Sequence, residues 1–157
     1  MDTLQILRSL RDSFVENGHE EAVLVTKDSG KTATDMLVTL HRDFGKRTAE
    51  AQGMFYFDQS GRLPLFVSRL LLGEDIPNDA ILPLCTEISL VNPTLPLGSF
   101  AFDAVTGSLE YLARLPIPED WDQETLLTEA DCAVALSLSV AERFAQTLQE
   151  IIGSYGV

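Results

Sequence analysis

Basic side chains are scarce in this sequence. Of its 157 residues, 11 are Lys or Arg and 24 are Asp or Glu, which gives a formal net charge of −13 at pH 7. Nucleic acids and anionic membranes are bound largely through Lys and Arg, so this scarcity argues against both as partners. Strong acidity is typical of a well-solvated surface. The alternative is that the acidic surface binds a basic protein partner.

Long apolar runs and cysteines are also lacking. No apolar run approaches the roughly 20 residues that a membrane-spanning helix needs. The N-terminal stretch MDTLQILRSLRDSF mixes charges with its apolar residues, unlike a secretory signal, so we expect a cytoplasmic protein. The two cysteines, Cys85 and Cys132, form neither a zinc-binding spacing nor a CxxC pair, and we expect both to be small core residues.

A complete phosphate-binding loop is missing as well. The stretch VLVTKDSGKTATD, residues 23–35, contains Gly30-Lys31-Thr32, but the motif also needs a glycine at position 25, where this chain has Val25. The residues after Thr32 alternate like a strand, whereas a phosphate loop is followed by a helix. We therefore predict a turn between two strands and no nucleotide site.

Few other residues suggest catalysis or metal binding. His19 and His41 have no Cys, Asp or Glu at a metal-binding spacing, and no GxSxG motif is present to hold a nucleophile. The acidic run over 119–131 precedes a helix, where carboxylates are favoured by the helix dipole, and Asp120 with Gln123 resembles a capping box. We predict no catalytic residue, no cofactor and no metal, and hence no enzyme.

Apolar periodicity predicts a single α+β domain over residues 1–157. Residues 3–16 and 124–152 carry apolar stripes at helical spacing, and a middle helix is expected from Asn78 or Asp79 to Val91. Strands are predicted at 22–28, 34–41, 53–58, 62–72, 100–103 and 109–115. Because the connections between most strands are short, the order helix, four strands, helix, two strands, helix favours a mostly antiparallel sheet with helices packed on it.

The last two predicted strands form the clearest hairpin. Phe100 and Phe102 alternate with smaller residues, and Gly107 lies in the turn. Leu109 and Tyr111 are expected to meet the two phenylalanines on one face. If that face is buried, Phe102→Ala should cost about 3–5 kcal/mol.

Two groups of residues are candidate contacts with a partner. The segment HRDFGKR, residues 41–47, is a local basic cluster that is either a solvated turn or a partner contact; its members are His41, Arg42, Lys46 and Arg47. In the terminal helix, further apolar residues lie beside the main stripe and widen it: Ala133, Leu136, Val140 and Phe144. A wide apolar face indicates either contacts in a homodimer or a helix buried between two layers.

The stretch LVNPTLPLGSFAFDAVTGSLEYLARLPI, followed by a long terminal helix, resembles the YbjN family and, beyond it, the type III secretion chaperones of the Tir-chaperone type. The resemblance covers about residues 76–153. In the first half only the order of elements agrees, and the four strands before the middle helix are one more than the three expected in the chaperones.

The resemblance implies a compact α+β domain that acts by binding. Secretion chaperones are small, acidic and usually dimeric, and they hold extended segments of their clients. No catalytic residues of the family can be carried over. We therefore expect a non-enzymatic protein-binding or chaperone-like module whose protein partner is unknown, as a candidate homodimer. The alternative is a small ligand-binding protein or an enzyme with an unrecognised pocket.

Overall fold

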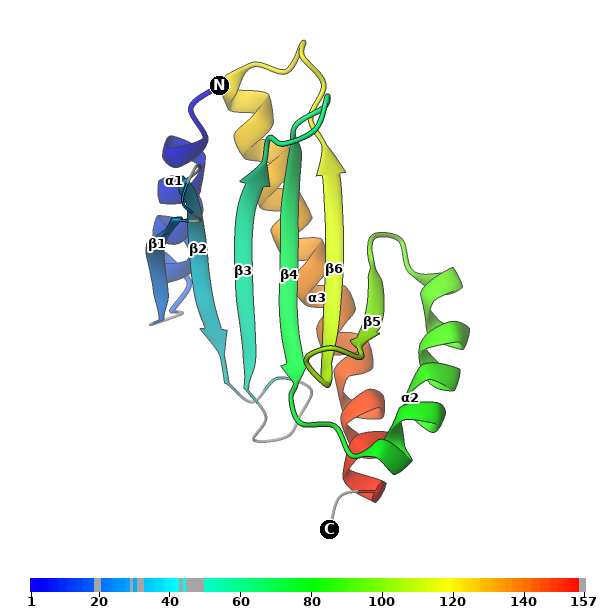
Figure 1. Ribbon diagram of the computed structural model, residues 1–157. Coiled ribbons are helices and arrows are strands. Elements are labelled where there is room, and N and C mark those ends of the chain that lie inside the picture. Colours follow the sequence, from blue (N-terminus) through cyan, green and yellow to red (C-terminus); the bar gives the residue numbers. More distant parts are fainter. Residues whose placement is uncertain (19–20, 29, 31–32, 43, 45–49, 156–157) are drawn as a thin grey trace.

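A six-stranded antiparallel sheet and three α-helices make up the part of the chain that the computed structural model describes, residues 1–18, 21–28, 30, 33–42, 44 and 50–155 (Figure 1). The strands lie in the order β1-β2-β3-β4-β6-β5. This confirms the predicted α+β fold and its order of elements. The bounds are α1 Thr3–Glu16, β1 Ala22–Asp28, β2 Ala33–His41, β3 Ala51–Asp58, β4 Leu65–Gly73, α2 Asn78–Val91, the 3₁₀ turn η2 Asn92–Thr94, β5 Ser99–Asp103, β6 Ser108–Pro116 and α3 Gln123–Tyr155.

Side-chain caps set where the first and last helices begin. The Asp2 carboxylate accepts a hydrogen bond from the backbone N–H of Gln5 at 3.1 Å, and the Asp122 carboxylate accepts one from the N–H of Thr125 at 2.7 Å. Asp122, and not the predicted Asp120, therefore caps α3. The Gln123 amide instead bonds to the backbone of Asp2, at 2.8 and 3.1 Å, and ties the start of α1 to the start of α3.

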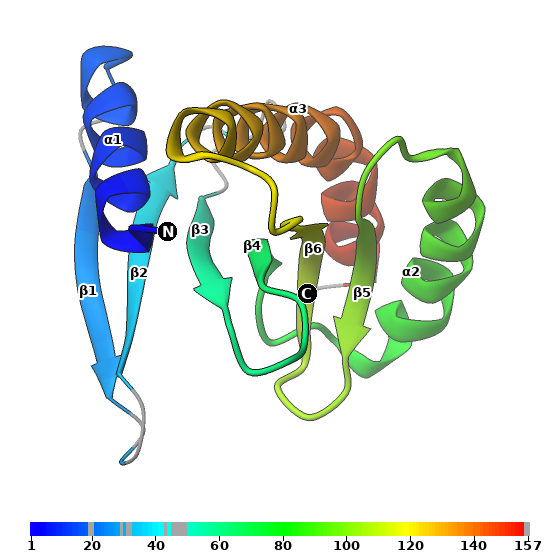
Figure 2. The same cartoon turned by 90° about the horizontal axis from the view of Figure 1, so that it is seen from above.

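All three helices lie to one side of the sheet or beside it. Seen from above, α1 and α3 cover one face of the sheet, while α2 lies next to β5 and contacts α3 (Figure 2). We call the face under α1 and α3 the helix face, and the opposite one the open face. No helix of the described chain covers the open face, which is turned to the viewer in Figure 1.

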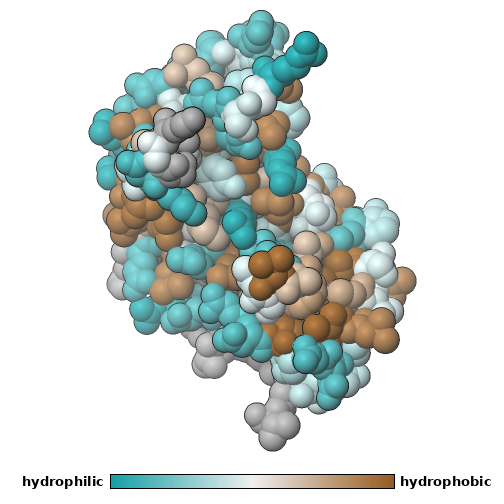
Figure 3. Space-filling view, viewed as in Figure 1, coloured by the Kyte–Doolittle hydropathy of each residue, from teal (hydrophilic) through white to brown (hydrophobic). Residues whose placement is uncertain are grey.

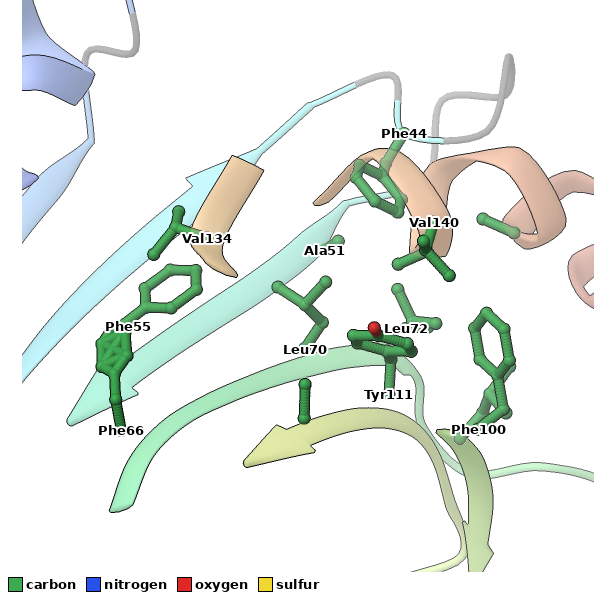
Figure 4. Packing of buried hydrophobic residues seen from close by; sticks show 14 of the residues in the cluster. Phe44, Ala51, Phe55, Phe66, Leu70, Leu72, Phe100, Tyr111, Val134 and Val140 are labelled. Atoms are coloured by element: carbon green, nitrogen blue, oxygen red, sulfur yellow. The ribbon is translucent and has the colours of Figure 1, made fainter. Parts of the chain in front are cut away.

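The hydrophobic core fills the space between the helix face and the helices. Alternate strand residues point into it, because successive side chains of a strand lie on opposite faces. In Figure 4 they approach Val134 and Val140 of α3, and they include the fully buried Phe55, Phe66, Leu70 and Tyr111.

The β5–β6 hairpin has the predicted register. Phe100 lies opposite Tyr111, and Phe102 lies opposite Leu109. Phe100 is 2 % exposed, whereas Phe102 is only half-buried near the end of the strand, so Phe100 is the anchor of this hairpin. Ala101, on the other face, is exposed as expected.

Two further sequence-based expectations had different outcomes. Cys85 is half-buried in α2, but Cys132 is exposed on α3, so the prediction that Cys132 is a core residue is wrong. The reason is that position 132 lies on the outer side of α3, between the buried Ala130 and Ala133.

Among the described residues, no helix combines the length and the apolarity needed to cross a membrane.

Candidate binding surface

The open face of the sheet carries apolar side chains in two rows across neighbouring strands. The pairing of β1 with β2, β3 and β4 places Val25 beside Met36, Met36 beside Tyr56, and Tyr56 beside Val67. The next row runs from Val23 through Val38 to Met54. We call these residues the open-face patch: Val23, Val25, Met36, Val38, Met54, Tyr56 and Val67.

Exposure within the open-face patch increases towards the edge of the sheet. Val67, in the middle, is 2 % exposed although no described helix covers it, because its cross-strand neighbours Tyr56 and Arg114 flank it. Val23 and Val25, on β1, are 57 % and 41 % exposed. The space-filling view from this side shows apolar residues over β1 and β2, and polar residues interspersed with apolar ones nearer the centre (Figure 3). The patch is most accessible at β1.

An ion pair borders the open-face patch on the side of β6. The Arg69 guanidinium donates from Nη2 to Glu110 Oε1 at 2.5 Å and from Nε to Oε2 at 3.2 Å, a two-pronged contact. The hydrogen bond to Glu110 raises the pKa of Arg69 further above its usual value. Since Arg69 lies opposite Met54, this ion pair forms a charged boundary of the open-face patch on the side of β6.

The predicted basic cluster does not form one exposed surface. His41 is 6 % exposed, and its imidazole lies between the rings of Phe14 and Phe44, with Nε2 hydrogen-bonded to Thr39 Oγ1 at 2.7 Å. His41 is therefore a core residue and not an accessible partner contact. Arg42 is exposed and donates to Glu21 Oε1 at 2.8 Å. Lys46 and Arg47 lie outside the described residues.

Most of the candidate dimer contacts on α3 are buried within the chain itself. Ala133 and Val140 are 7 % and 6 % exposed, and the ring of Phe144 is half-buried with its centroid 6.2 Å from that of Phe100. Ala133 and Val140 are thus inaccessible to a second copy, and Phe144 is accessible only in part. Leu136 alone of the four has a substantial exposed fraction, 39 %. The wide apolar face of α3 is explained by its contacts with the sheet, α1 and α2.

A hollow lies at the end of the sheet nearest the start of α1. It has a volume of about 430 Å³ and is lined by side chains that include Thr3, Asp35, Tyr56 and Asp58. The Asp58 carboxylate accepts hydrogen bonds from the hydroxyl and the N–H of Ser60, at 2.6 and 3.0 Å, which lower the pKa of Asp58. A carboxylate with a lowered pKa is ionised at neutral pH, which suits a turn but not proton transfer.

Other shifted carboxylates have similarly local causes. Backbone hydrogen bonds from Val105 and Thr125 lower the pKa values of Asp103 and Asp122, respectively, and both carboxylates close a turn or cap a helix. Among the described residues, no group of three or more His, Cys, Asp or Glu side chains is arranged to hold a metal ion.

Sequence reasoning did not single out the residues of the open-face patch. The available signal was the run of adjacent apolar residues in the strands, such as Met36-Leu37-Val38 and Phe55-Tyr56-Phe57. A strand with one wet face alternates apolar and polar residues, so such runs indicate strands that are apolar on both faces. Compared with models of protein families and with curated protein sequences, the chain matches none.

Proposed function

We propose that this protein is a non-enzymatic, cytoplasmic protein-binding module of the YbjN or secretion-chaperone kind, which binds an amphipathic segment of another protein on the open face of its sheet. The observation that supports this is the open-face patch. A sheet face that meets only water can carry polar residues at little cost. This face instead carries contiguous apolar side chains that are half-buried at Met36, Val38, Met54 and Tyr56 and exposed at Val23 and Val25, and such apolar patches mark interaction surfaces.

The expected partner segment has two kinds of residue. Apolar side chains at the spacing of a strand or of one helix face would contact the rows that contain Met36, Tyr56, Val38 and Met54. Basic side chains at its margins would be attracted by the strongly acidic chain, whose net charge is −13. Arg69 and Glu110 satisfy each other, so they limit the patch without needing a charge from the partner.

The alternative is a small ligand-binding protein or an enzyme that uses the hollow beside Asp58. No specific observation favours it, because the nearby carboxylate is held in its ionised form by a turn. In addition, the lining of the hollow mixes polar residues such as Thr34, Asp35 and Gln59 with Ala33, Tyr56 and Phe57, whereas the walls of ligand pockets are usually predominantly apolar.

The experiment compares two variants that differ only in which surface they change. Val38→Gln/Met54→Gln removes apolar surface from the open face without adding charge. Ala135→Gln/Ser139→Gln introduces the same two glutamines on the exposed side of α3 and leaves the open face unchanged. Each variant and the wild type is immobilised and used to capture proteins from its native extract, after circular dichroism has shown that all three are folded.

We expect a protein that the wild type and the α3 variant retain and the open-face variant loses. With the captured protein purified, its affinity should fall about tenfold or more, since each large apolar side chain that is buried contributes about 1.5–3 kcal/mol. Equal retention by both variants would place binding elsewhere, and saturable binding of a metabolite that depends on Asp58 would favour the alternative.

A further inference from the structure

The two edges of the sheet are protected differently. At the β5 edge, the Asn92 side chain accepts a hydrogen bond from the N–H of Phe100 at 2.8 Å and donates one to its carbonyl at 3.0 Å, and α2 lies alongside (Figure 1). This edge is therefore closed to another strand. At the β1 edge, no side chain among the described residues makes such a bond to the backbone of the strand.

The pairing of β1 with β2 determines which backbone groups of β1 point outwards. The N–H of Leu40 donates to the carbonyl of Glu21 at 3.0 Å, and these residues lie opposite each other in the register. Hydrogen-bonded and non-hydrogen-bonded pairs alternate along an antiparallel ladder. It follows that Val23, Val25 and Lys27 bond inwards to β2, whereas the outer edge presents the N–H and C=O groups of Ala22, Leu24 and Thr26.

The sequence of this edge is complementary to itself in one register. In this register, Leu24 lies opposite Leu24 of a second, antiparallel copy. Each residue whose backbone N–H and C=O groups point outwards then faces another such residue, and Val23 lies opposite Val25 of the second copy. Glu21, whose carboxylate also accepts from Arg42 of its own chain at 2.8 Å, then lies opposite Lys27 of the second copy on the same face of the sheet. Symmetry makes this opposite-charge contact twice. A shift of the two-fold centre to Val23 or Val25 keeps the backbone pairing but loses the charge match. Lysine on an edge strand usually discourages pairing, but here the partner strand supplies its counter-charge.

We propose that a second copy of this protein docks on the edge of β1, so that the two β1 strands pair antiparallel about a two-fold axis at Leu24. Such an interface is isologous, as in most homodimers. It joins the two sheets and brings the most exposed parts of the two open-face patches, Val23 and Val25, together at the centre of one continuous face. This places the dimer contact on β1 and not on α3.

The test is the mass of the purified full chain in solution, measured by light scattering over a dilution series. The wild type should have twice the monomer mass of 17.3 kDa at micromolar concentration. Lys27→Glu, which sets two acidic residues opposite each other, should weaken the dimer about tenfold or more. Adding Glu21→Lys to this variant should restore part of the dimer affinity, because the charges across the interface are then exchanged and complementary again, although the ion pair between Glu21 and Arg42 is lost.

Two further variants separate the β1 edge from other surfaces. Thr26→Pro removes an outward N–H that β2 does not use, so it should give a folded monomer. Leu136→Gln, on α3, should leave the dimer intact. A wild-type mass of 17.3 kDa at every concentration, or a Lys27→Glu variant that dimerises like the wild type, would overturn the proposal. Because only purified protein is used, the outcome is independent of whether a partner binds the open face.

Discussion

Replacing Phe100 with alanine should be among the most destabilising single changes in this protein. Phe100 is 2 % exposed, and its ring centroid lies 5.3 Å from that of Tyr111 and 6.2 Å from that of Phe144. The substitution removes a large apolar side chain where β5, β6 and α3 meet. The surrounding residues belong to three different elements, so they cannot easily close together over the cavity.

The expected cost is about 3–5 kcal/mol, the usual range for a buried Phe→Ala change. Both ring contacts have edge-on geometry, which places the cost in the upper part of that range. A domain of this kind typically has a free energy of unfolding of about 5–15 kcal/mol, so the variant loses a large share of it. The melting temperature should fall by roughly 6–20 °C for a chain of this length.

Urea unfolding followed by circular dichroism measures this loss, and two neighbouring substitutions serve as controls. Phe102→Ala should cost about 1–3 kcal/mol, because Phe102 is only half-buried. Ala101→Ser, on the exposed face, should change stability by less than about 0.5 kcal/mol. If Phe102→Ala were as costly as Phe100→Ala, the assigned difference in burial would be wrong, and an equal loss from Ala101→Ser would refute the register of the hairpin.

Three other changes test neighbouring parts of the fold. Gly98→Ala should lower the melting temperature, because Gly98 has a φ of +72°, which residues other than glycine rarely adopt. A Cβ at this position would also lie 2.6 Å from the Tyr111 hydroxyl and 2.7 Å from the carbonyl of Leu112. An unchanged melting temperature would contradict this geometry. Burial raises the pKa of Tyr111 above its ordinary value of 10.0, so the stability that its neutral form contributes should be complete below pH 10.0 and lost as pH rises through the raised pKa. In a pH titration, the phenolate absorbance of the wild type should include a step above pH 10.0 that is missing from Tyr111→Phe. If that step persisted in the variant, the raised pKa would belong to another tyrosine. Asp122→Asn should keep a cap on α3, because the amide oxygen can accept the same bond from the N–H of Thr125, but it should remove the pH dependence of the cap. Because hydrogen bonding lowers the pKa of Asp122, the carboxylate cap should contribute fully above the ordinary value of 3.8 and be lost as pH falls through the lowered pKa. Equal acid unfolding midpoints for Asp122→Asn and the wild type would show that another carboxylate controls the transition.

The order of helices and strands could be predicted because it depends on local patterns. The apolar stripes of α1 and α3, the turn glycines Gly30 and Gly107, and the break at Asn92-Pro93 all act within a few residues. Element ends were less predictable. Asp120 and Asp122 are both acceptable caps by type, and only the position of the chain entering α3 decides that Asp122 reaches the N–H of Thr125.

The exposure of individual side chains depends on contacts between distant segments. The apolar residues Val140 and Phe144 looked like surplus on α3, but α3 packs against the sheet, α1 and α2 and needs a wide apolar face. In the same way, a strand such as β3 is apolar on both sides, and its own sequence does not say which side the helices cover. Here α1 and α3 both cross the side of Phe55, which leaves the side of Met54 and Tyr56 open.

The open-face patch is not simply a core face without its helix. Its middle is partly shielded, since Val67 is 2 % exposed between neighbouring side chains and the patch residues on β2 and β3 are half-buried. The unfavourable exposure is concentrated at Val23 and Val25, on the one edge of the sheet that no described side chain caps. Polar residues at these two positions would keep the strand and reduce the exposed apolar area, because both side chains point to the open side. Their apolar character is explained if something covers them, and strand pairing across the β1 edge covers them without requiring any rearrangement of the sheet.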